Sequence, residues 1–147
     1  MFREYIFCLV LAAATFNANA DCSVTFHSGD QVRKVIKKSD GWTFNNYDQI
    51  CTKLNKARAA LRIQGNATVL SNHSIAWAVV GVKDVGLEIA SQDFSGTSTQ
   101  INTFASIDKA EEMLWIAIND AVSVMDLDNA LQQLEIARKQ VRAAYKK

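Results

Sequence analysis

The chain of 147 residues contains no proline and only six glycines. Proline and glycine punctuate most linkers, so their scarcity leaves no internal domain boundary in the sequence. After the first twenty residues no apolar run approaches the length of about 20 residues that spans a bilayer. We therefore expect a single domain, residues 21–147, with no membrane anchor.

The motifs of the common catalytic and metal sites are missing too. The chain has only two histidines, His27 and His73, and it has no Gly-rich phosphate loop, nucleophile elbow, zinc-protease or EF-hand pattern. Ser106 and Lys109 match the S-x-x-K pattern of penicillin-recognising enzymes, but the partner motifs are absent, so Ser106 is better explained as a helix N-cap. We expect no metal, no cofactor and no catalytic residue.

The first twenty residues have the composition of an export signal. A short polar start carries Arg3, an apolar run follows, and the small-x-small pattern ends at Ala20. This predicts a secretory signal peptide cleaved between Ala20 and Asp21, and therefore a periplasmic or extracellular protein. Asp21, which is not a small residue, precedes Cys22, and this argues against a lipid anchor.

Cleavage at that point would remove Cys8 and leave two cysteines, Cys22 and Cys51. In an exported protein an even pair of cysteines is most simply one disulfide. The pair lacks C-x-x-C spacing, and only His27 and His73 could complete a metal site with it. We therefore predict a structural disulfide between Cys22 and Cys51.

Charge is distributed in blocks along the chain. The net charges are +4 over residues 21–62, −2 over 63–105, −5 over 106–128 and +4 over 129–147. Nucleic-acid binders usually carry one dominant basic field, so this alternation argues against a nucleic-acid partner. It favours internal ion pairs or a charged protein partner.

Apolar spacing predicts helices in both terminal parts of the chain. Two short helices are expected over residues 28–38 and 46–61, with a strand as the alternative for the first of them. A pair of long helices begins after Ser106 and Asp126. Ser28, followed three residues later by Gln31, matches a capping box for the first helix.

Period-two patterns between the helices predict an antiparallel meander. The expected strands are residues 61–69, 75–82, 85–89 and a polar edge strand over 97–103. Residues 75–82 are apolar on both faces, which indicates a central strand covered on both sides. The predicted fold class is α+β, with three to four antiparallel strands packed against a C-terminal helical hairpin and one or two N-terminal helices stapled by the disulfide.

Candidate binding residues are apolar side chains in unusual places. Trp42, Phe44 and Tyr47 form an aromatic cluster that could stack on a sugar or anchor a partner, or could simply plug the junction between helices and sheet. On the two long helices, Ile116 and Ile136 fall opposite the apolar stripes and Trp115 lies at a stripe boundary. These three could mark a partner or dimer surface, although scattered exposed apolar residues are common. Arg138 does the reverse and projects from the centre of an apolar stripe.

These observations favour a small exported protein without enzymatic activity. Its expected function is to bind another protein, for instance as an immunity protein or inhibitor in a bacterial periplasm, and a second copy of the chain is one candidate partner. The alternatives are a small-molecule or glycan-binding periplasmic protein that uses Trp42, Phe44 and Tyr47, or a small hydrolase.

Overall fold

The computed structural model describes residues 22–145. The predicted signal peptide and its cleavage point lie outside the described residues. Within the described part, no helix has the length and apolar character needed to cross a membrane. The chain runs through β1 (Phe26–Ser28), α1 (Asp30–Lys38), α2 (Tyr47–Lys56), β2 (Ala59–Leu70), β3 (His73–Asp84), β4 (Gly96–Asn102), α3 (Ile107–Ser123) and α4 (Leu127–Ala144).

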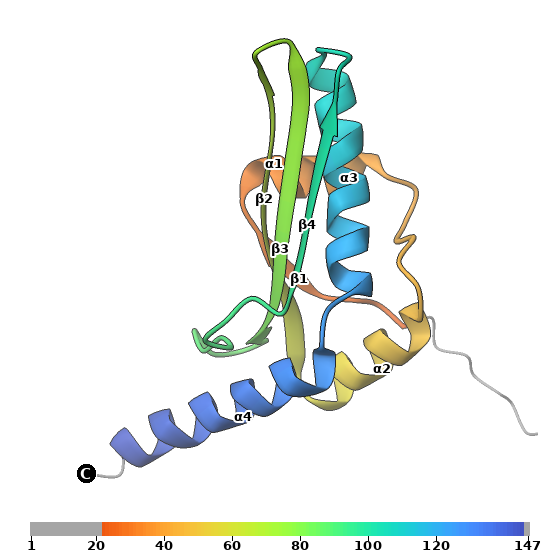
Figure 1. The fold of residues 1–147 in the computed structure, drawn as a ribbon. Helices are drawn as coiled ribbons and strands as arrows, with labels where there is room; N and C mark the ends of the chain where they lie inside the picture. The colour runs from red at the N-terminus through yellow and green to blue at the C-terminus, as the bar shows by residue number, and fades with distance from the viewer. Residues whose placement is uncertain (1–21, 146–147) are drawn as a thin grey trace, which may run out of the picture.

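The strands form one sheet in the order β1-β2-β3-β4 (Figure 1). β2, β3 and β4 pair antiparallel, which confirms the predicted antiparallel meander. β1 pairs parallel to β2, so the sheet is mixed. The parallel pairing arises because α1 and α2 form a crossover between the two strands, whereas a short turn joins β2 to β3. The α+β class is confirmed.

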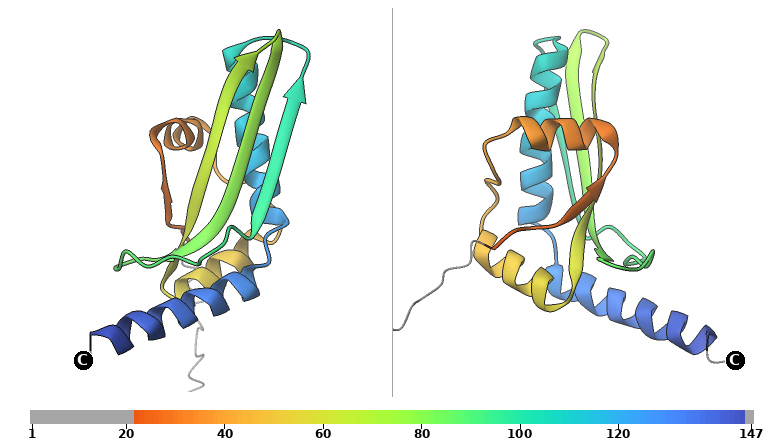
Figure 2. Two further views of the ribbon diagram at one scale, coloured as in Figure 1. Left: turned by 60° about the vertical axis from the view of Figure 1, so that its left-hand side comes forward. Right: turned by 180° about the vertical axis from the view of Figure 1, so that it is seen from behind.

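Helix α3 covers one face of the sheet, and α1 lies on the same side (Figure 2). The core lies between α3 and the sheet, where alternate residues of β3 and the inner face of α3 are buried: Ala76, Ala78, Val80, Val82, Leu114, Ala117, Ile118 and Ala121. The approach is closest at Gly96 of β4, where an added Cβ would lie 1.9 Å from the carbonyl oxygen of Ala121. Only glycine lets β4 approach α3 this closely.

The C-terminal helical pair is present, but its two helices diverge. α3 follows the sheet, whereas α4 turns away and runs past the end of the sheet (Figure 1). Lys53 of α2 forms an ion pair with Asp128 of α4 at 2.7 Å, which holds the start of α4.

The predicted disulfide joins Cys22 to Cys51, with 6.0 Å between the Cα atoms. It ties the segment before β1 to α2, and Cys51 is fully buried. The staple therefore fixes the N-terminal edge of the sheet against the helical part of the fold.

Three local predictions are corrected. Residues 85–89 are not a strand: they form a bend in which the Asp84 carboxylate accepts the N–H groups of Gly86 and Leu87. β3 is central, but it is not covered on both faces along its whole length. The capping box at Ser28 does not form, because α1 has Gly29 at its N-cap and no side-chain cap bond. The Gln31 side chain reaches β2 instead.

Candidate functional site

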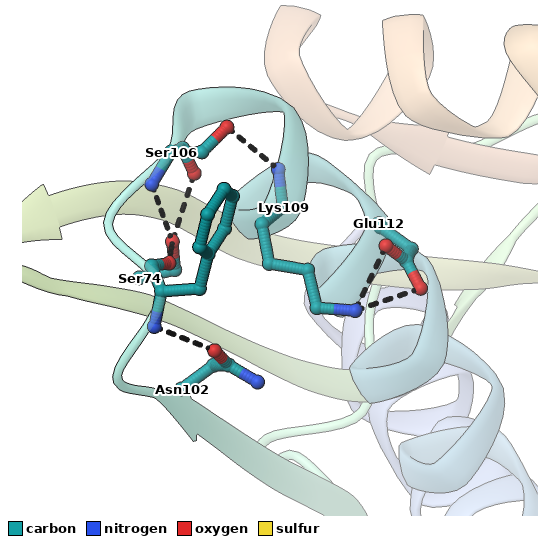
Figure 3. Close-up of polar contacts among 6 residues, drawn as sticks. Ser74, Asn102, Ser106, Lys109 and Glu112 are labelled. Atoms are coloured by element: carbon teal, nitrogen blue, oxygen red, sulfur yellow. Dashed lines mark hydrogen bonds and ion pairs between the residues drawn. The ribbon is translucent and has the colours of Figure 1, made fainter.

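The S-x-x-K segment is a helix start, as predicted (Figure 3). The Ser106 hydroxyl accepts the backbone N–H of Lys109 at 3.4 Å and so caps α3. The Lys109 ammonium turns to Glu112, at 2.9 and 3.0 Å from its two carboxylate oxygens. The fully buried Ser74 holds the loop before the helix by donating to the carbonyl oxygens of Phe104 and Ser106. The Ser106 hydroxyl and the Lys109 ammonium therefore both have structural partners.

The two histidines lie on different strands. His27 is exposed on β1, and His73 begins β3 with its Nδ1 2.8 Å from the carbonyl oxygen of Ser71. Neither histidine lines any of four depressions on the surface of residues 22–145. The described geometry therefore gives no support to the hydrolase alternative.

The predicted aromatic residues do gather in one cluster, centred on Trp42. Its ring centroid lies 5.7 Å from that of Phe26, 5.4 Å from Phe44 and 5.5 Å from Trp115, and Phe44 stacks in turn on Tyr47 at 5.4 Å. The cluster thus joins β1, the segment between α1 and α2, and α3. Offset and edge contacts of this kind stabilise a packed junction.

Two further contacts fix this cluster in place. The Tyr47 hydroxyl donates to the carbonyl oxygen of Cys22 at 2.7 Å, and the Asn119 side chain accepts the backbone N–H of Thr43 at 2.9 Å. Phe44 is only 5 % exposed, so its ring offers no surface to a ligand, while Trp42, Tyr47 and Trp115 are half-buried against the core. These contacts describe a packed junction between the helices and the sheet, the alternative to a binding site for Trp42, Phe44 and Tyr47.

A shallow groove of about 230 Å³ lies between α1 and α3, and Trp115 lines it together with Lys38, Asp108, Glu111 and Glu112. The buried Glu111 carboxylate lies 2.7 Å from the ammonium of Lys34 and 3.8 Å from that of Lys38. The hydrogen bond from Lys34 lowers the pKa of Glu111 below its ordinary value, and this outweighs the burial that raises it. Beside the groove, the Lys34–Glu111 and Lys38–Glu111 ion pairs therefore link the first basic block of the sequence to the acidic block.

Ile116 and Ile136 are exposed, at 41 and 49 %. They lie on α3 and α4, which run in different directions (Figure 1). The structure does not bring them into the aromatic cluster, although Trp115 next to Ile116 belongs to it.

The second face of the sheet is not covered by a helix of the described residues. Figure 2 shows, on its left, the described strands in front of α3 with no helix over them. We call this surface the open face; it carries Gln64, Asn66 and Thr68 of β2, Ile75, Trp77 and Val79 of β3, and Thr97, Thr99 and Ile101 of β4. None of these nine side chains is charged.

Two apolar side chains stand out on the open face. Trp77 is 39 % exposed and pairs with Thr99 across the β3–β4 ladder, and Ile101 is 67 % exposed and pairs with Ile75. The sequence reasoning missed Trp77 because it treated residues 75–82 as covered on both sides. A signal was present in the polar residues that alternate along β2, whose side chains are neighbours of Trp77 on the same face.

A loop closes the lower end of this face. Phe94 packs its ring 4.2 Å from the guanidinium carbon of Arg62, and Arg62 also donates to the carbonyl oxygen of Ser91 at 3.3 Å. The backbone of residues 93 and 94 lies directly over Gly81. The open face therefore extends from this loop to the β2–β3 turn.

The two edges of the sheet differ in how they end. Beyond the short β1, the outer edge of β2 is met by Gln31, whose side-chain amide donates to the carbonyl oxygen of Ala67 at 2.9 Å and accepts the N–H of Ala67 at 3.1 Å. β4 is the terminal strand on the other side, and within residues 22–145 it pairs with β3 alone. The polar edge strand predicted over 97–103 is thereby confirmed.

Comparisons with protein-family models, with curated proteins and with solved structures find no match to this chain. Among residues 22–145, the open face carries the exposed Trp77 and Ile101 and adjoins β4, a strand that pairs on one side only.

Proposed function

We propose that this is an exported, non-enzymatic protein that binds another protein by accepting an extended segment beside β4. The observation that carries the proposal is a terminal strand of seven residues without charge or proline, next to the exposed Trp77. A terminal strand presents unpaired backbone N–H and C=O groups, and natural proteins usually block such an edge with charge, proline or a covering element. An unblocked edge suits strand addition.

The side chains beside the edge indicate the chemistry of the partner. Thr97, Thr99 and Ile101 point to the open face, and Trp77 lies one strand further in. Tryptophan is enriched among residues that dominate binding energy, so Trp77 is the expected anchor. Because no charged group lies on this part of the face, the matching partner segment is uncharged there and carries an apolar side chain toward Trp77.

Ion pairs within the fold support the proposal that the open face binds its protein partner without using charged groups. Lys34 and Lys38 pair with Glu111, Lys53 pairs with Asp128, and Arg138 pairs with Asp84. Part of the blockwise charge of the sequence is therefore paired within the chain, in the contacts of Lys34, Lys38, Lys53 and Arg138. The uncharged open face is left as the recognition surface, in keeping with an immunity-protein or inhibitor role.

Site-specific photo-crosslinking tests the proposal. A photoreactive amino acid replaces Thr99 on β4 in one variant and Thr52, exposed on α2, in a matched control. We expect an adduct from position 99 and none from position 52 in cells that export the protein, with the adduct identified by mass spectrometry. The purified partner should then bind the wild-type chain, and binding should be lost when Thr97 and Thr99 are both replaced by lysine.

A charge-matched variant separates edge blocking from general charge. It carries Gln49→Lys and Thr52→Lys on α2 and should bind as the wild type does. Recovery of the chain alone from both crosslinking positions, or equal loss of binding in both lysine variants, would contradict strand addition at β4. An adduct with twice the mass of the chain would identify a second copy as the occupant.

A further inference from the structure

A cleft of about 460 Å³ lies where α4 passes the end of the sheet (Figure 1), and none of the nine open-face residues lines it. Its walls come from the α2–β2 junction, the bend after β3 and the middle of α4. The charged lining residues are Lys56, Arg58, Arg138 and Arg142 against Asp84 and Glu135, a net charge of +2.

Arg138 forms the rigid wall of this cleft. It is 6 % exposed; its Nε donates to Asp84 at 2.8 Å, its Nη1 donates to the carbonyl oxygen of Ala57 and to Glu135, and its Nη2 donates to the carbonyl oxygen of Arg58. The Arg138 guanidinium therefore pairs with both acidic residues of the cleft and also binds the backbone of Ala57 and Arg58. The hydrogen bond to Arg58 fixes a residue whose φ is +50°, in the left-handed region.

The other three cations have no carboxylate partner among residues 22–145: Lys56, Arg58 and Arg142 are exposed and form no ion pair there. Elsewhere in the fold the basic residues Lys34, Lys53 and Lys109 each meet an acidic side chain. Like charges gathered in a cleft repel one another, and such a cleft focuses a positive potential. Packing does not require this arrangement, since none of the three side chains is buried.

We propose that this cleft binds a multivalent oxyanion, a ligand group bearing phosphate or several carboxylates, between Lys56, Arg58 and Arg142. Two guanidinium groups supply the paired N–H donors that match oxyanion geometry, and the ammonium adds a third donor. The Arg138 network keeps Asp84 and Glu135 from competing with the ligand, because both already accept hydrogen bonds from Arg138. This site is independent of strand addition at β4.

Nuclear magnetic resonance titration of the purified chain tests the site. Tripolyphosphate and citrate are added in separate arms, with acetate at matched ionic strength as the monovalent control. We expect saturable shifts of the backbone amides of residues 56–58, 86–87 and 138–142 with at least one multivalent anion. The arm that binds more tightly distinguishes a phosphate ligand from a carboxylate ligand.

Variants locate the binding. Arg142→Gln should weaken the affinity about fivefold, and the double variant Lys56→Gln and Arg142→Gln should weaken it more than tenfold. Lys139→Gln removes the same charge from an exposed position of α4 outside the cleft and should leave the affinity within about twofold. The absence of saturable shifts with both anions, or an equal weakening by Lys139→Gln, would overturn the proposal.

Discussion

The two edges of the sheet end in opposite ways. At the β1–β2 edge the chain places a short parallel strand, a disulfide that anchors the segment before it, and the Gln31 amide on the backbone of Ala67. At the β4 edge it places seven uncharged residues and no covering element within the described part. Both edges present the same backbone chemistry. The difference is that a short strand, a disulfide and the Gln31 side chain close the β1–β2 edge. Closure serves stability, and the open edge is where function is expected.

The largest expected effect comes from opening the disulfide at the closed edge. Cys22 and Cys51 are 29 residues apart, and a loop of about this size stabilises by roughly 3–4 kcal/mol in the chain-entropy estimate. We expect reduction to lower the melting temperature without changing the helix and strand content seen by circular dichroism. An unchanged melting temperature after confirmed reduction would show that the bridge is not a staple.

The next largest effect tests how the open edge is held. Gly96→Ala adds a Cβ 1.9 Å from the carbonyl oxygen of Ala121, so β4 must move away from α3. We expect a loss of about 3 kcal/mol in the free energy of unfolding, measured with urea. Gly29→Ala is the matched control, because no atom lies within 4 Å of its added Cβ. Similar losses in the two variants would contradict the close approach of β4 to α3.

Gln31→Ala removes the side chain that closes β2. It leaves the N–H and C=O of Ala67 without these partners, and Ala67 is buried, so we expect a loss of about 2 kcal/mol. Gln49→Ala, at an exposed position of α2, should cost less than about 0.5 kcal/mol. An effect of Gln31→Ala no larger than this control would mean that the side-chain amide does not close the edge.

The smallest effect is the pH dependence of stability that comes from the Lys34–Glu111 ion pair, which joins α1 to α3. The pKa of Glu111 is lowered in the folded chain by the hydrogen bond from Lys34, so its contribution to stability is complete above its ordinary pKa of 4.5 and is lost as the pH falls through the folded value. Asp84 contributes in the same direction: burial raises its pKa, but the N–H groups of Gly86 and Leu87 together with Arg138 lower it more. Urea unfolding across pH 3–6 should show a shallower decline for Glu111→Gln than for the wild type. Identical slopes would exclude the Lys34–Glu111 pair as a source of the decline.

Local patterns were enough to predict much of the fold. The Ser106 cap and the polar edge strand depend on residues close in sequence. The Cys22–Cys51 bridge was predicted because an exported protein with two cysteines is expected to pair them. The false strand at residues 85–89 had an alternating pattern, but Asp84 accepts the N–H groups of Gly86 and Leu87 and holds the chain in a bend.

The open face was harder to predict from the sequence, because which face of a sheet is covered by helices depends on the assembled fold. Whether Trp77 is buried depends on which face α3 takes, and no pattern within residues 75–82 specifies that. Gln31 matches a local capping pattern, yet its side-chain amide donates to the carbonyl oxygen of Ala67, 36 residues away. The exposure of Ile116 and Ile136 follows from helical spacing, but their separation follows from the turn between α3 and α4.

Amide hydrogen exchange of the monomeric chain compares the two edges most directly. In an antiparallel edge strand every second N–H points away from its neighbour and exchanges quickly when nothing covers it. We predict that β4 shows this alternation of fast and slow amides, while the Ala67 amide is protected in the wild type and exchanges quickly in Gln31→Ala. Uniform protection along β4, or rapid exchange of Ala67 in the wild type, would contradict the account of one open and one closed edge.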